Sequence, residues 1–183
     1  MNETINAIFD RRSIRSFTAE PLAKEQINTL AEVAMASPSG MNLQPWLFHF
    51  VTDQARISAV SEAAVSFFRK TNNQAVIDRI ASRHPSIFYG APLVVFITTP
   101  KDNPSGVDVG IAVANLVIAA QSMGLGSCII GMASAAFGSD QAADVARLLE
   151  VPDDRAFVVS IAIGHPAATK EAHERNPEKV KFL

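Results

Sequence analysis

The sequence has a single cysteine, Cys128, among its 183 residues. One thiol cannot form a disulfide within the chain, and it cannot build a cysteine-rich metal site. The four histidines, at positions 49, 84, 165 and 173, show no ligand spacing such as H-x-x-x-H, so we expect no metal centre. The motif G-x-S-x-G is also absent, which leaves a serine hydrolase without support.

The chain also lacks a surplus of positive charge. Its 16 Lys and Arg residues against 18 Asp and Glu residues give a net charge of -2, which argues against a nucleic-acid partner. The first residues, MNETINAIFD, lack the basic and apolar regions of a signal peptide, so we expect a cytoplasmic protein. The longest apolar run, Val109 to Ala120, is shorter than the roughly 20 residues of a membrane span, so we expect no membrane partner.

Hydrophobic periodicity and turn residues predict a single domain over 1–183, in which 166–183 form a polar tail without periodicity. We expect helices over 2–9, 23–36, 53–69, 72–83, 108–123 and 140–149, and strands over 46–51, 93–99, 127–132 and 156–164. The order does not alternate strictly enough for a doubly wound nucleotide-binding fold. The pattern therefore predicts an α+β fold with a mixed or antiparallel sheet of about four strands surrounded by helices.

The expected helix over 108–123 is apolar on nearly every face, apart from Asn115. Such a helix must be covered on nearly every face, and a small monomer has little material for that. We therefore expect this helix to lie at a subunit interface, and the chain to form a homodimer.

The stretch DRRSIRSF, from Asp10 to Phe17, concentrates three arginines near the start of a nearly neutral chain. In extended backbone, Arg11, Ser13 and Arg15 would point to the same side. Two guanidinium groups with a hydroxyl between them suit a phosphate followed by a polyol, because Arg binds phosphate in a bidentate way. The alternative interpretation is a solvated turn.

A second unusual stretch is PSGMNLQPW, from Pro38 to Trp46. It offers a hydroxyl at Ser39, a glycine that allows close backbone approach, and the amides of Asn42 and Gln44. Amides both donate and accept hydrogen bonds, which suits the edge of a uracil-like ring. The alternative is an ordinary helix-to-strand loop, with Trp46 as a core residue.

Together these stretches resemble the FMN-dependent nitroreductase family. The motifs RRSIRSF, PSGMNLQPW, APLVV and GLGSCIIG occur in the family's order, and the resemblance covers nearly the whole chain. It implies a nitroreductase-like fold that forms an intertwined homodimer, with two FMN molecules in the interface.

The resemblance also implies which residues contact FMN. They are Arg11, Arg12, Ser13, Arg15, Pro38, Ser39, Gly40, Met41, Asn42, Gln44, Ile129, Ile130, Gly131 and Arg175. Residues 11–13 would hold the phosphate and ribityl chain, with Arg175 or Lys170 completing the phosphate site. Arg15 would be the cation near the pyrimidine edge, and the partner subunit would supply residues 38–44. The strand end at 129–131 would pack on the ring, with the Gly131 backbone N–H directed toward N5.

The implied function is an FMN-dependent NAD(P)H oxidoreductase. NADH or NADPH would deliver a hydride to flavin N5, and a nitroaromatic or quinone-type acceptor would then be reduced in a ping-pong cycle. No side chain need act as acid or base, while Arg15 would stabilise the negative charge that hydride transfer leaves on the ring. Cys128 is interpreted as a buried structural thiol. Candidate pocket aromatics, alternatively core residues, are Phe67, Phe68, Phe88 and Tyr89.

Three alternatives remain open from the sequence. The first is a specialised family member, such as a reductive dehalogenase or a flavin-destroying ligand synthase. The second is a non-catalytic FMN-binding or regulatory dimer that does not use NAD(P)H. The third is a helical scaffold without a cofactor.

Overall fold

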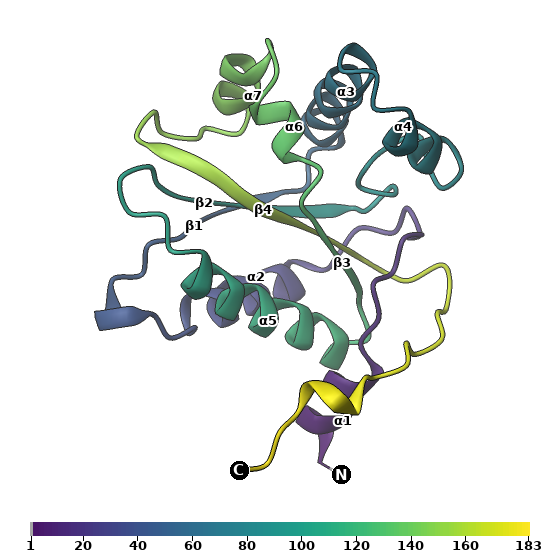
Figure 1. Cartoon of the computed structure of the whole chain (residues 1–183), viewed down its shortest axis with the longest axis vertical. Helices are drawn as coiled ribbons and strands as arrows, with labels where there is room; N and C mark the ends of the chain where they lie inside the picture. The colour runs from purple at the N-terminus through teal and green to yellow at the C-terminus, as the bar shows by residue number, and fades with distance from the viewer. Residues whose placement is uncertain (1) are drawn as a thin grey trace.

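The computed structural model describes residues 2–183 and places one sheet between two layers of helices (Figure 1). The sheet has the order β1-β2-β4-β3, and every neighbouring pair of strands is antiparallel. The strands are β1 (Leu47–Val51), β2 (Leu93–Pro100), β3 (Gly126–Ile130) and β4 (Arg155–Gly164). The predicted α+β class and the expectation of about four strands are therefore confirmed.

Seven α-helices and two short 3-10 helices occur within residues 2–183. The α-helices are α1 (Glu3–Asp10), α2 (Lys24–Met35), α3 (Gln54–Lys70), α4 (Gln74–Ala81), α5 (Gly106–Ser122), α6 (Ser134–Phe137) and α7 (Ala142–Leu148). The 3-10 helices are Gly40–Asn42 and Pro177–Lys179. The sequence missed α6, because four residues are too few to show a helical period.

The two faces of the sheet form separate cores. Strand β2 is buried along nearly its whole length, as its continuous apolar character predicts. Its Val94 and Phe96 pack in the core beneath α3 and α6, whereas Val95 and Ile97 pack in the core above α2 and α5. Trp46 is 8% exposed and belongs to this second core, which confirms its interpretation as a core residue.

The arginine segment lies along β3. The Ile14 N–H donates to the Ser127 carbonyl at 2.9 Å, and Ser13 forms an isolated parallel bridge with Ser127. The approach is close at Gly126, where a Cβ would lie 3.1 Å from the Ile14 side chain. Glycine at this position therefore lets the arginines following α1 pack against the sheet.

In the single chain, one face of helix α5 is buried and another face is exposed to solvent. Leu116 and Ala120 are fully buried, whereas Val107 is 77% exposed and Ala114 is also exposed. No helix within residues 2–183 is long and apolar enough to cross a membrane.

Candidate functional site

A cavity of about 230 Å³ opens between the end of α1 and the C-terminal tail. Arg11, Arg12 and Ser13 line it from one side, and Lys170 and Arg175 line it from the tail. The structure therefore brings together the residues predicted to hold a phosphate, including both candidates for the final cation.

Two guanidinium nitrogens in this segment are buried without a partner. Arg11 Nη1 and Arg12 Nε have no hydrogen-bond acceptor among residues 2–183. The other end of the Arg12 group is fixed, because its Nη1 donates to the carbonyls of Phe9 at 2.6 Å and Arg11 at 2.9 Å. Buried donors nearly always have acceptors, and an anion in the cavity would supply them.

The C-terminal tail crosses the end of α1 and is held there by a cation–π contact. The Arg175 guanidinium carbon lies 4.5 Å from the centroid of the Phe9 ring. Such a contact within about 6 Å is attractive, because the ring face is electron-rich. It holds the Arg175 charge beside the cavity that this residue lines.

The end of β3 presents an apolar side chain and open backbone. Ile129 is 44% exposed between the buried residues Cys128 and Ile130. Gly131 is exposed, and within residues 2–183 nothing beyond its two chain neighbours lies within 4 Å of the position that a Cβ would occupy there. This strand end could accommodate a flat ring against Ile129 with a backbone group at its edge.

Arg15 lies near the same strand. Its Nη1 lies 3.4 Å from the Ser13 carbonyl, and its side chain is half-buried. Burial raises the pKa of the Cys128 thiol, while the charges of Arg15 and Arg11 act in the opposite direction. Cys128 is 2% exposed, as expected for a structural thiol.

Sequence reasoning missed Ser127 as a candidate. Its hydroxyl is buried and lacks a hydrogen-bond partner within residues 2–183. Ser127 lies two positions before Ile129, so both side chains face the same side of the strand. Its bridge to Ser13 comes from residues distant in sequence, so no local pattern could have revealed this position beside the arginines.

The second predicted motif lies at a different part of the chain. The loop of residues 38–44 lies at the start of α5, where the Gly40 N–H donates to Asp108 Oδ1 at 3.0 Å. The arginine segment instead lies beyond the end of α5, where Ile14 contacts Gly126. Figure 1 shows the two segments far apart, separated by the length of α5, which is about 25 Å for 17 residues. Within one chain, the structure does not bring the two motifs together.

The suggested aromatic lining is largely core. Phe88 is fully buried and packs edge-on against Phe96, with ring centroids 5.5 Å apart. Tyr89 is 5% exposed in the same core, whereas Phe67 and Phe68 are partly buried against it. The core alternative is therefore the better interpretation for Phe88 and Tyr89.

The fold and site define an α+β protein with an arginine-lined cavity next to a segment that pairs with β3. A family model for the nitroreductase family matches residues 8–165, and the chain belongs to this family. The NADPH-flavin oxidoreductase of Vibrio harveyi is 33% identical over 98% of this chain and 72% of its own length.

Solved structures show the same fold over the whole chain. A nitroreductase with bound FMN from Desulfitobacterium hafniense DCB-2 superposes with a TM-score of 0.95 at 30% identity, covering 100% of this chain and 99% of that chain. An FMN-dependent nitroreductase from Clostridium difficile R20291 has a TM-score of 0.84 at 31% identity, with the same coverage. The predicted nitroreductase-like fold is confirmed.

Proposed function

We propose that this protein is an FMN-dependent NAD(P)H oxidoreductase that reduces nitroaromatic or quinone-type acceptors in a ping-pong cycle. The observation that carries the proposal is the arginine-lined cavity, whose lining residues Arg11 and Arg12 each bury one guanidinium nitrogen that has no acceptor within residues 2–183. The names of the relatives support the same chemistry. Bound FMN would supply the redox chemistry, taking a hydride at N5 and passing reducing equivalents to the acceptor.

The residues of the cavity fit a phosphate dianion. Arg11 and Arg12 offer N–H groups that have no acceptor within residues 2–183. Ser13 offers a hydroxyl, and Lys170 and Arg175 add two further charges. Charge-assisted hydrogen bonds of this kind are about twice as strong as neutral ones. These residues therefore bind and orient the cofactor through its phosphate end.

The residues along β3 position the reactive end of the site. Ile129 offers an exposed apolar surface for the ring, and the backbone N–H of Gly131 is assigned to N5. Arg15 is assigned to the pyrimidine edge, where a fixed cation stabilises developing negative charge. Solvent supplies protons, so this assignment requires no acidic or basic side chain.

A second copy of the chain completes each site. The exposed apolar face of α5 needs a cover, and Met41 and Leu43, in the loop at its start, are 92% and 58% exposed. A homodimer joined along α5 would cover these surfaces and bring residues 38–44 to the arginines of the other chain. We therefore assign the protein as a homodimer with two sites, and we expect it in the cytoplasm.

Anaerobic reduction followed by visible spectroscopy tests the function. Purified protein should be yellow, lose its colour with NADH or NADPH in the absence of oxygen, and regain it with a quinone. A yellow protein that neither nucleotide bleaches would instead support the non-catalytic FMN-binding dimer. A colourless protein whose melting temperature does not rise with added FMN would contradict the proposal entirely.

A further inference from the structure

The loop of residues 39–44 adopts an uncommon backbone conformation. Met41, Asn42 and Gln44 have φ angles of 52°, 56° and 44°, in the left-handed region that favours glycine. Residues other than glycine persist there when the surrounding structure holds them. The loop therefore needs anchors, and it is the segment proposed to contact the partner subunit's cofactor.

Asp108 anchors the centre of the loop from the first turn of α5. Its Oδ1 accepts the Gly40 N–H at 3.0 Å, across 68 positions of sequence. Its Oδ2 accepts the hydroxyl of Ser105, the residue that caps α5. One carboxylate thus joins the start of a core helix to the backbone of an exposed loop.

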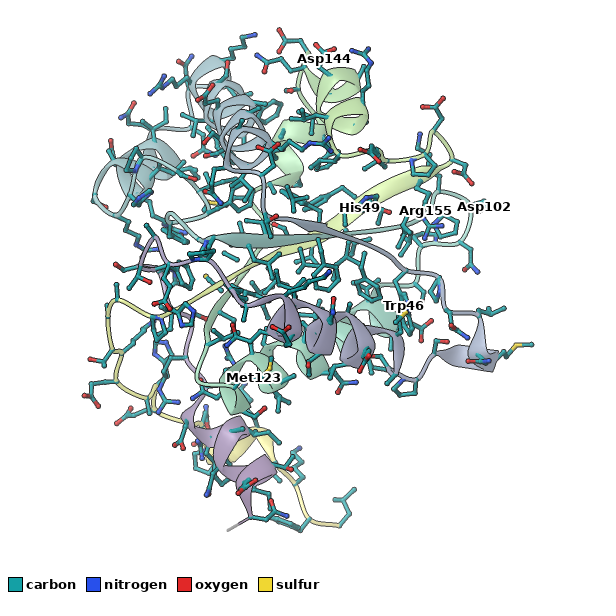
Figure 2. All side chains as sticks on the ribbon, turned by 180° about the vertical axis from the view of Figure 1, so that it is seen from behind. Trp46, His49, Asp102, Met123, Asp144 and Arg155 are labelled. Atoms are coloured by element: carbon teal, nitrogen blue, oxygen red, sulfur yellow. The ribbon has the colours of Figure 1, made fainter. Side chains whose placement is uncertain are left out.

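Inside the loop, Ser39 Oγ accepts the Gln44 N–H at 2.9 Å and Gln44 Nε2 donates to Asn42 Oδ1 at 3.0 Å. Two other side chains from outside the loop bind its flanks. Asn115 Nδ2 donates to Ser37 Oγ at 3.0 Å before it, and Arg155 Nη2 donates to the Pro45 carbonyl after it. Figure 2 shows Arg155 and Trp46 at the same end of the sheet. Trp46 comes directly after Pro45, where the loop leads into β1. Within residues 2–183, the bond from Gly40 to Asp108 is therefore the side-chain hydrogen bond from another element that reaches the turn itself, next to Met41 and Asn42.

The Asp108 carboxylate is charged near neutral pH. The hydrogen bond from Ser105 and then that from the Gly40 backbone lower its pKa. An ionised acceptor makes a stronger hydrogen bond to a backbone N–H than a neutral one. The spacing Ser105–Asp108 also matches a helix-capping arrangement, but capping alone gives no reason for a bond to Gly40.

We propose that Asp108 is a positioning residue, which holds the 39–44 loop in the conformation that completes the partner subunit's FMN site. This inference rests on the proposed function. Asp108 acts through Gly40 and the turn that follows, and it does not itself contact the cofactor. Its loss would loosen the loop and weaken FMN binding while the arginine cavity stays intact.

The rate of amide hydrogen exchange at Gly40 in the cofactor-free protein measures directly how firmly the loop is held. Asp108→Ala should speed exchange of the Gly40 amide about tenfold or more, because its acceptor is lost, and should weaken FMN binding by a similar factor. Asp108→Asn keeps an acceptor oxygen but loses the charge, so both values should lie between those of Asp108→Ala and those of the parent. Ser105→Ala removes the helix cap but leaves the bond between Asp108 and Gly40. It should therefore change the Gly40 exchange rate and the FMN affinity much less than Asp108→Ala does.

Three results would overturn the positioning role. The first is Gly40 exchange that is unchanged in Asp108→Ala, and the second is an equal effect from Ser105→Ala, which would indicate helix capping. The third is a loosened loop with unchanged FMN affinity, measured by flavin fluorescence. Failure of the parent itself to bind FMN would instead overturn the proposed function, so the two failures are distinguishable.

Discussion

Arg175 stacks on Phe9, with its guanidinium carbon 4.5 Å from the centroid of the ring. The pair joins the C-terminal tail to α1 and places a cation beside Arg11 and Arg12 in the same cavity. The tail is otherwise exposed, so this contact holds it at the cavity, where a negative charge would bind. The charge of Arg175 and its stacking should therefore contribute separately to cofactor affinity.

Substitution of each partner should separate these contributions. Arg175→Ala should weaken FMN binding about tenfold, because a charge-assisted contact to the phosphate is lost. Phe9→Leu should weaken it about two- to fivefold, because only the exposed cation–π contact is lost. Fluorescence titration of the cofactor-free variants measures both. Parent-like affinity in Arg175→Ala would leave Lys170 as the tail cation that binds the phosphate.

Arg11 and Arg15 should differ in what they control. Arg11→Ala should cost about 1.5–3 kcal/mol of FMN binding, because Arg11 is assigned to the phosphate. Arg15→Ala should change the flavin reduction potential more than occupancy, because Arg15 is assigned to the pyrimidine edge. Arg147→Ala is the matched control, since Arg147 is exposed and, within residues 2–183, its side chain pairs only with Asp144. If Arg11→Ala and Arg15→Ala both behave like this control, the assignment of the segment is wrong.

The open face of α5 should control both assembly and cofactor binding. Ala114→Arg places a charge on this face and should shift the protein toward monomer in analytical ultracentrifugation. FMN affinity should fall with it, because the loop of a second copy is lost. Ala143→Arg, at an exposed helical alanine of α7, should leave both unchanged. A dimeric Ala114→Arg variant with parent-like affinity would exclude this face as the interface.

His49 should make stability depend on pH. Burial lowers the pKa of His49, and the charge of Arg155 acts in the same direction. The folded protein thus protonates this ring at a lower pH than the unfolded chain, in which the pKa is about 6.5. The stability present above that pH should fall as the pH drops below it.

Urea unfolding at pH 7.5 and 5.5 measures this effect in the parent and in His49→Gln. The parent should lose more free energy of unfolding between the two pH values than the variant does. His49 lies 3.3 Å from Thr98 Oγ1, and glutamine keeps a polar group for that contact. If both proteins show the same pH dependence, titratable groups other than His49 cause the loss of free energy of unfolding at low pH.

Local features of the fold could be predicted from sequence because their causes are local. Asn2 and Asp53 begin helices, and their side chains accept the backbone N–H groups that helix starts leave free. Strand β2 was recognisable because continuous apolar character reflects burial on both faces. Gly124 ends the helical pattern with a φ of 73°, a conformation that glycine adopts freely.

Features that depend on distant contacts were beyond sequence reasoning. The bond between Gly40 and Asp108 spans 68 positions, and the bridge between Ser13 and Ser127 spans even more. From the local sequence alone, Asp108 is predicted to be a residue at the start of a helix, and Ser127 is predicted to be an ordinary residue of an apolar strand. The arginine and loop motifs were recognisable through resemblance, but their separation within one chain required the structure.

Mixed dimers test the central claim, that each FMN site joins the arginines of one chain to the loop of the other. Arg11→Ala and the double variant Ser39→Ala/Asn42→Ala should each bind FMN weakly as homodimers. A heterodimer of the two, purified through different affinity tags, should contain one site with parent affinity, because one arginine segment and the opposing loop are both intact. If each site instead forms within a single chain, every site of the heterodimer contains a substituted segment. A heterodimer in which no site binds FMN with parent affinity would therefore contradict the claim.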